Sequence, residues 1–419
     1  MKNHHRIKLL TSALLLALSA PLLAQDLLIT NGRVLDGKGG VIDKGSVLIR
    51  AGKIESVTAG TQTANGIKVI DAGGKTIMPG LVEGHRHVIQ GNPGTWLAER
   101  APKQMQEFLD AGFTTVLSAI DAAPIIEARD RIARGDMQGP RLLTGTFIPV
   151  AGAITDGPPP EPGDPARTDP ARIGGGNKAA PAIPREVIIA AVAAAKKAGY
   201  DYLKCVVNTT PGGPEIATLK LIVEEGKKVG MPTIVHAVSV KDSAAAIDAG
   251  PAMLVHTPHI GRLDEDQAAL KKIVGAGIPM TSTLAVFVPH FDANNKPLFR
   301  DAQPFPFNTL SSAGQGPVNA RLLWEAGITY GFGTDTTWAP KESLSDELRA
   351  LRLVFSPTDI VKIITINAAI ATQHGKEFGS LEAGKAGDVV IIDGNPLQDS
   401  GALLHVVTTI KGGKVVFNK

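Results

Sequence analysis

The sequence predicts an α/β protein built on a (β/α)8 barrel, with β-rich segments at both ends of the chain. Two observations lead to this fold class. Short, continuous apolar runs alternate with helical stretches through the middle of the chain, a pattern typical of a parallel sheet that helices cover. These runs also number eight, the number of strands in a (β/α)8 barrel.

The elements follow in a regular order along the chain. From Asp26 to about Pro79, and again over residues 379–419, short strands alternate with turns. Eight barrel strands are predicted at 81–88, 113–119, 141–150, 201–208, 232–238, 252–258, 280–288 and 328–336. Helices are predicted between them, among others at 184–199, 214–229, 240–249, 264–275 and 314–326.

Residues 151–183 form a long segment that is too rich in Pro and Gly for regular structure. It follows a predicted barrel strand, so we expect it at the carboxyl-terminal face, where the active sites of barrels form. The alternative is a surface insertion without a role in the site.

The amino-terminal segment 1–24 has the character of a secretory signal. Lys2, Arg6 and Lys8 precede the apolar run 9–24, which is too short and too interrupted to span a membrane. We expect cleavage near Ala24–Gln25 and a secreted or periplasmic protein; the alternative is an amphipathic first helix. Cleavage removes three of the 43 basic residues and leaves 40 against 40 acidic ones.

The neutral mature chain lacks the basic surface that nucleic-acid binding requires, and only 4% of the residues are aromatic. We therefore expect a small-molecule substrate, no nucleic-acid partner, and no membrane contact after cleavage. The sequence leaves monomeric and homo-oligomeric states open.

Histidines and other polar residues end several predicted strands. His85 and His87 are two residues apart, so their side chains point to the same side of a strand and could bind one Zn, Fe, Ni or Cu ion. Alone, such a pair often occurs by chance. Four more residues occupy the ends of later strands, in barrel order: Lys204, His236, His256 and Asp335. Together the six predict a metal centre.

Lys204 is unusual because it lies within an apolar strand, where an unpaired lysine is rare. Strand alternation puts Tyr202, Lys204 and Val206 on one side. Leu203 and the lone cysteine, Cys205, then face the helix layer, which would bury the thiol.

Several motifs together resemble the signatures of the metal-dependent amidohydrolase superfamily: "PGLVEGHRHV", "DYLKCVV", "IVHAV", "LVHTPH", "GFGTDT" and the tail "GSLEAGKAGDVVIIDGNPL". The chain is most similar to the prolidase-like and imidazolonepropionase-like branches, where some relatives cleave dipeptides, N-acyl amino acids or the ochratoxin amide. The resemblance implies a catalytic barrel over 80–378 and a small β-sandwich built from 25–79 and 379–419.

The resemblance also implies roles for the six residues. His85, His87 and Asp335 would hold the more buried of two divalent ions, with zinc favoured, and His236 and His256 the second. Lys204 would bridge both as its Nζ-carbamate. A hydroxide shared by the ions would attack the substrate carbonyl, and Asp335 would carry the proton to the leaving amine.

The chain departs from this pattern at two positions: Glu83 stands where the family usually has Asp, and Arg86 where it has a small or neutral residue. Alternation turns Arg86 away from the metals, and we expect it to pair with an acid in the helix layer or at the sandwich interface; a substrate contact is the alternative. His259 and His290 are candidate substrate contacts, with surface positions as the alternative.

The predicted function is a secreted amidohydrolase that cleaves the amide of a dipeptide or an N-acyl amino acid. The apolar residues of 305–308 suit a pocket for a substrate side chain. Cations of the loops after barrel strands suit a substrate carboxylate, and they are Arg167, Arg172, His290, Lys296 and Arg300. Alternatives are a lactonase, esterase or cyclic amidase with the same metals, or a barrel retained for binding alone.

The basic start and the short apolar run predict that the mature protein begins near Gln25. Amino-terminal sequencing of protein from its native host checks this. Cytoplasmic material that retains Met1 would contradict it.

Overall fold

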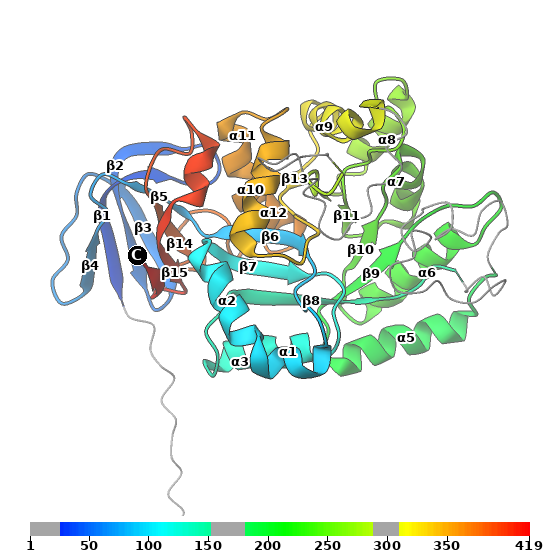
Figure 1. Cartoon of the computed structure of the whole chain (residues 1–419), viewed down its shortest axis with the longest axis horizontal. Helices are drawn as coiled ribbons and strands as arrows, with labels where there is room; N and C mark the ends of the chain where they lie inside the picture. The colour runs from blue at the N-terminus through cyan, green and yellow to red at the C-terminus, as the bar shows by residue number, and fades with distance from the viewer. Residues whose placement is uncertain (1–25, 152–180, 288–309) are drawn as a thin grey trace, which may run out of the picture.

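The computed structural model describes residues 26–151, 181–287 and 310–419. Figure 1 shows a barrel surrounded by helices and, beside it, a β domain built from the two ends of the described chain. Residue 290, most of the segment 151–183 and the apolar residues 305–308 lie outside the described residues.

Eight parallel strands form the barrel, as the sequence predicts, and they pair in chain order from β6 to β13. They are β6 (Leu81–Arg86), β7 (Phe113–Ser118), β8 (Arg141–Phe147), β9 (Tyr202–Val206), β10 (Thr233–His236), β11 (Met253–Val255), β12 (Met280–Thr281) and β13 (Tyr330–Gly331). The backbone after β13 closes the ring onto β6: Gly84 N donates to Phe332 O at 2.9 Å, and Asp335 N donates to His85 O at 2.8 Å.

Helices cover the outside of the barrel, and each of the five predicted helices is present. The helices are α1 (Pro93–Glu99), α2 (Ala101–Asp110), α3 (Pro124–Arg134), α5 (Arg185–Ala198), α6 (Glu215–Lys228), α7 (Val240–Ala246), α8 (Gln267–Gly275), α9 (Leu310–Glu325), α10 (Pro340–Leu351), α11 (Pro357–Lys362) and α12 (Ala368–Ala371). Shorter helical turns are η2 (Ile247–Ala249), η3 (Ile363–Asn367) and η4 (Ser400–Leu404). Glycines in the left-handed conformation follow α3 and α5, where they end each helix without the strain that a side chain would add.

The second sheet combines strands from both ends of the chain. Its strands are β1 (Leu27–Leu35), β2 (Val41–Arg50), β3 (Lys53–Ala59), β4 (Lys68–Asp71), β5 (Thr76–Pro79), β14 (Val389–Ile392), β15 (Val406–Lys411) and β16 (Lys414–Asn418). The amino-terminal and carboxyl-terminal strands meet where β5 pairs with β14. An apolar core drawn from both groups, including Ile49, Ile77 and Val389, lies within this domain. The sandwich from both chain ends is thus confirmed, while its domain boundaries stay predictions.

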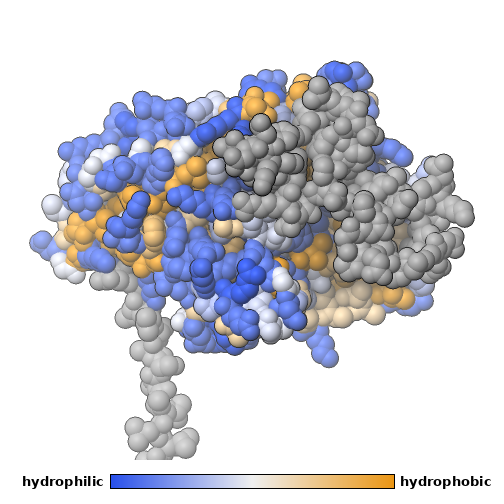
Figure 2. Space-filling view, in the orientation of Figure 1, coloured by the Kyte–Doolittle hydropathy of each residue, from blue (hydrophilic) through white to orange (hydrophobic). Residues whose placement is uncertain are grey.

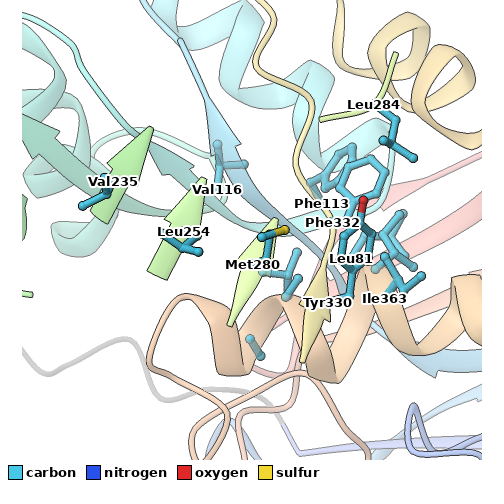
Figure 3. Packing of buried hydrophobic residues seen from close by; sticks show 14 of the residues in the cluster. Leu81, Phe113, Val116, Val235, Leu254, Met280, Leu284, Tyr330, Phe332 and Ile363 are labelled. Atoms are coloured by element: carbon cyan, nitrogen blue, oxygen red, sulfur yellow. The ribbon is translucent and has the colours of Figure 1, made fainter. Parts of the chain in front are cut away.

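The two faces of the barrel strands pack into different cores. Tyr202, Ile234 and Met253 belong to a cluster inside the barrel, whereas Leu203 and Cys205 belong to the large cluster under the helices. This confirms the predicted alternation on β9, and burial raises the pKa of the Cys205 thiol to about 12. Figure 3 shows Leu81, Phe113, Tyr330 and Ile363 together, so apolar packing also joins the first and last strands.

All eight predicted strands extend beyond the strands that form, and the excess is largest in the runs at 280–288 and 328–336. The runs at 141–150 and 280–288 end as strands at Phe147 and Thr281. In the second run, the amides of Leu284 and Ala285 donate to the carboxylate of Glu347 at 2.9 and 2.8 Å instead of to a neighbouring strand. Apolar composition therefore predicts burial of this run correctly and its conformation wrongly.

Hydrophilic side chains cover much of the visible face in Figure 2, and apolar ones gather at the left, over the β domain, and along the lower right edge, where α5 lies. α5 exposes 50% of Val187 and 41% of Ile189. Among the described residues, none of the helices has the length and apolar character needed to cross a bilayer.

Arg141 links the barrel to the sandwich, so its removal should destabilise the fold. Its guanidinium donates to Thr115 and to Asp388 Oδ2, both at 2.8 Å, and lies 4.7 Å from the Phe378 ring centroid. The Asp388 side chain is only 3% exposed, so Arg141→Met strands a buried carboxylate. We expect the free energy of unfolding to fall by about 1–3 kcal/mol in denaturant titrations.

The matched control is Arg134→Met, because Arg134 is 55% exposed and pairs only with surface acids among the described residues. It should change the free energy of unfolding by less than about 0.5 kcal/mol. Equal stabilities of the two variants would contradict the linking role of Arg141.

Candidate metal centre

The predicted site residues converge at the carboxyl-terminal ends of the barrel strands. His85 lies on β6, Lys204 on β9 and His236 on β10, while His256 follows β11 directly and Asp335 lies four residues after β13. His85 and His256 are almost fully buried, and Lys204 is 2% exposed. Because parallel strands end at one rim, residues far apart in sequence meet there.

Asp335 is at the centre of this group. Its Oδ1 lies 3.0 Å from Nε2 of His85 and 3.0 Å from Nε2 of His87, and its Oδ2 lies 3.8 Å from Nδ1 of His256. One ligand atom each from His85, His256 and Asp335 fall within 4.8 Å of one another. A single divalent ion could therefore bind all three.

Lys204 and His236 complete the cluster. Nζ of Lys204 lies 3.3 Å from Nε2 of His85. The ring centroid of His236 lies 4.4 Å from that of His256, which in turn lies 5.1 Å from that of His85. The structure thus brings all six predicted residues together.

Burial sets the protonation of the site. It lowers the pKa values of His85 and His236 to about 3, with Lys204 adding to the effect. Burial opposes the ionisation of Asp335, but the imidazoles of His256 and His85 hold the pKa of this carboxyl well below its usual range. Neutral imidazoles and an ionised carboxylate are the forms that bind metals.

The donor set fits a divalent metal ion on further grounds. Nδ1 of His87 lies 3.3 Å from Ile120 O, an outer contact that directs its Nε2 toward Asp335. Nδ1 of His256 lies 2.7 Å from Oγ1 of Thr283. Nδ1 of His85 is buried and has no hydrogen-bond partner within the described chain. Such a packed set of nitrogen and oxygen donors is typical of Zn²⁺ and related ions.

Three residues that build the site have left-handed backbone conformations. His256, Thr283 and Asp335 have φ values of 77°, 47° and 54°. Non-glycine residues in this region cost about 1–3 kcal/mol each and persist where the surroundings fix them, as at functional sites. They follow three consecutive strands, β11, β12 and β13, so the strain is concentrated on one side of the rim.

Arg86 points into the helix layer, but its partners differ from the predicted acid. NH1 lies 3.1 Å from Ser343 Oγ, 3.3 Å from Thr336 Oγ1 and 3.4 Å from Thr334 Oγ1, and NH2 donates to Trp338 O. Its guanidinium also lies 4.9 Å from the Phe108 ring centroid. Among the described residues, no acid of the helix layer or the sandwich interface hydrogen-bonds Arg86, because hydroxyls and a carbonyl supply the acceptors; the charges of Glu83 and Asp121 act on it at longer range. Burial lowers the Arg86 pKa to about 10, which leaves it a cation at neutral pH.

The second departure, Glu83, holds the same region together. Its Oε1 accepts from His85 N and from Thr334 N, both at 3.0 Å, and so joins β6 to the segment after β13. The carboxylate is buried, and burial raises its pKa to about 7. Glu83 therefore fixes the backbone at His85 and at Thr334, the residue before Asp335.

The candidate substrate contacts have different outcomes. His259 is 5% exposed and stacks on Phe287 at a centroid distance of 3.8 Å, so the alternative of a surface position was wrong. His290 lies outside the described residues. Sequence reasoning missed Thr283 and Glu347. Thr283 lies within the run 280–288 that the sequence predicts as a strand, so its position after the end of β12 gave no signal.

Comparisons with known proteins agree with this geometry. Residues 76–416 match the amidohydrolase family. The chain is 28% identical to an imidazolonepropionase of Shouchella clausii (strain KSM-K16) over 432 aligned residues, which cover 90% of this chain and 86% of the relative.

Solved structures share the fold. A Xaa-Pro dipeptidase with bound methionine in its active site superimposes with a TM-score of 0.72 and 23% identity, over 93% of this chain and 99% of that one. The ochratoxinase of A. niger gives a TM-score of 0.71 and 20% identity, over 94% and 96%.

Proposed function

The chain belongs to the amidohydrolase family, and from this premise we propose that it is a binuclear metal enzyme that cleaves the amide of a dipeptide or an N-acyl amino acid. Hydrolysis of C–N bonds is the coarser function that the family and its relatives support. The observation that carries the proposal is the convergence of the six predicted residues at one rim, where Asp335 lies 3.0 Å from His85 and His87, and the ring of His236 lies 4.4 Å from that of His256.

The six residues divide between two ions. His85, His87 and Asp335 would hold one, His236 and His256 the other, and Lys204 would lie between them. When bound, the two ions would lower the pKa of a shared water and polarise the substrate carbonyl. Zn²⁺ is the ion we favour, because imidazoles supply most of the donors.

Lys204 is suited to carbamate formation. Burial lowers the pKa of its amine to about 7, so a large share of the side chain is neutral and nucleophilic at physiological pH. The amine nitrogen would form a bond to the carbon of CO₂ and lose one proton. The product is an anion with two oxygen donors, which replaces a buried cation and complements the neighbouring imidazoles.

Asp335 is the group placed to move the proton. Its carboxylate is ionised and lies 3.0 Å from two imidazole nitrogens at the rim. It would accept the proton that water loses as its oxygen bonds to the carbonyl carbon. It would then donate that proton to the amine nitrogen as the C–N bond breaks.

The substrate class rests on two lines of support. Loop cations after the barrel strands, such as Arg167 and Arg300, suit a free carboxylate, although they lie outside the described residues. The dipeptidase and ochratoxinase names of the structural neighbours suit an amide next to an amino acid. The apolar residues 305–308 favour a hydrophobic amino acid.

The test compares one hydrophobic dipeptide or N-acyl amino acid with its carboxyl-terminal amide. We expect kcat/KM to fall by about 10-fold or more when the carboxylate is blocked, because a charged hydrogen bond contributes about 1.5–3 kcal/mol. Equal values for the two compounds, or a preference for lactones, would overturn the substrate class.

A second candidate, hydrolysis of a cyclic amide, follows from the 28% identity to an imidazolonepropionase over 90% of the chain. A panel that includes cyclic amides separates the two. Faster turnover of a cyclic amide than of any linear one would select this alternative.

Lys204→Ala should lose most of the bound metal and most of the activity, because it removes the bridging ligand. Metal content by elemental analysis and hydrolysis rates check this. Short carboxylic acids should restore part of both by occupying the vacated space. Full metal content and full activity without added acid would contradict the binuclear site.

Asp335→Asn should lower kcat by about 100-fold or more, the size of a general acid–base contribution, and far more than it lowers metal content. Asn keeps the shape but cannot take up the proton. Steady-state kinetics at saturating metal provide the measurement. A variant that holds both ions and keeps near-normal kcat would exclude Asp335 as the proton carrier.

A further inference from the structure

Helix α10 contacts two of the segments that build the metal centre, although it contributes none of the proposed ligands. Ser343 and Glu347 are one turn apart on this helix, so their side chains lie on the same face. Both are buried, with exposed fractions of 1% and 0%. Each is part of the link to a different segment of the rim.

The first link passes through Arg86. Its NH1 lies 3.1 Å from Ser343 Oγ, while the same nitrogen lies 3.3 Å from Thr336 Oγ1. NH2 donates to Trp338 O. Thr336 Oγ1 also donates to Ser343 Oγ at 2.8 Å. Arg86 and Ser343 therefore both hydrogen-bond to the segment 334–338, which contains Asp335 in its left-handed conformation.

The second link is the carboxylate of Glu347. Its two oxygens accept from Leu284 N at 2.9 Å and from Ala285 N at 2.8 Å. These amides follow Thr283 directly, the left-handed residue whose hydroxyl contacts Nδ1 of His256. The carboxylate thus fixes the turn that orients a ligand of the second ion.

The two segments also contact each other, because Thr283 N donates to Gly333 O at 2.9 Å. Displacement of either segment would therefore affect the other. The strain at Thr283 and Asp335 needs surrounding contacts that hold it in place. The guanidinium of Arg86, bound to Ser343 of α10, supplies charged hydrogen bonds to the first segment, and such bonds are stronger than neutral ones. The carboxyl group of Glu347 accepts two backbone amides of the second segment.

We propose that Arg86 and Glu347 are positioning residues, through which α10 sets the Asp335 segment and the Thr283 turn in the geometry that the metal centre requires. The inference rests on the proposed binuclear function and deepens it. A purely structural role would stabilise the fold without a specific effect at the rim. The two roles differ in where local opening occurs and in what happens to metal affinity.

The experiment measures hydrogen exchange of the metal-free full-length chain, followed by Zn²⁺ titration against a competing chelator. Arg86→Met removes the donors and keeps an unbranched side chain, and Glu347→Gln leaves one of the two backbone amides without its acceptor. We expect faster exchange in peptides covering 282–287 and 333–338. We also expect Zn²⁺ affinity to fall by about 10- to 100-fold, as for other residues that orient metal ligands.

Two matched controls lie away from the rim. Arg141→Met removes an arginine that also stacks on a phenylalanine and binds a threonine and an acid. Glu225→Gln alters a buried glutamate of α6 that pairs with Arg185 and Lys228. Both should lose stability without faster exchange at 282–287 and 333–338 and without loss of Zn²⁺ affinity.

Milder variants keep the test decisive if Arg86→Met does not fold. Ser343→Ala removes only the hydroxyl of α10 and should give the same changes at 333–338 to a smaller extent. Arg86→Lys retains the charge and some of the hydrogen bonds, so it should recover part of the Zn²⁺ affinity lost in Arg86→Met. If Arg86→Met is insoluble, Arg86→Lys should still bind Zn²⁺ more weakly than the wild type and show faster exchange at 333–338.

Unchanged exchange at the two segments, or changes equal to those of the controls, would overturn the positioning role. Because exchange is measured without metal or substrate, it decides this point even if the wild-type chain binds no Zn²⁺. A wild-type chain that binds no Zn²⁺ would instead refute the proposed function. Faster exchange with unaltered Zn²⁺ affinity in a chain that binds the metal would also reject the inference.

Discussion

Closure of the barrel between its first and last strands is the constraint on which the site depends. The segment after β13 binds back onto β6 through Gly84, His85 and His87, and the same segment delivers Asp335 to the two histidines. Glu83 and Arg86 lie on opposite faces of β6, and both contact Thr334, which stabilises this closure. The closing hydrogen bonds and the candidate ligands share one stretch of backbone, so the geometry of the candidate metal centre depends on closure of the ring.

Burial then determines the chemistry that this geometry can support. Exclusion of water keeps the imidazoles of His85 and His236 neutral and lowers the pKa of the Lys204 amine, while His256 and His85 keep Asp335 ionised. An unpaired carboxylate or amine would be costly in such a place. The cluster is therefore a set of donors whose charges a divalent ion would complete, and the strained residues around it are held by contacts from the helix layer.

The sequence predicts the barrel and the position of its ligands because strand ends in a (β/α)8 barrel share one rim. The positions of His236 and Asp335 at the rim could be predicted once the strands that contain or precede them were assigned. Prediction from the sequence fails where a residue contacts another that is distant in the sequence. An apolar run does not reveal that its amides bind Glu347, and a buried arginine does not reveal that hydroxyls rather than an acid will surround it. His259 is buried for the same reason, because Phe287 covers it.

The most direct test of the account is anomalous X-ray diffraction at the zinc absorption edge, from crystals of the full chain equilibrated with Zn²⁺. The account predicts two peaks per chain, one beside His85, His87 and Asp335 and the other beside His236 and His256, with Lys204 between them. A map without zinc at this rim, or with only one ion there, would contradict it.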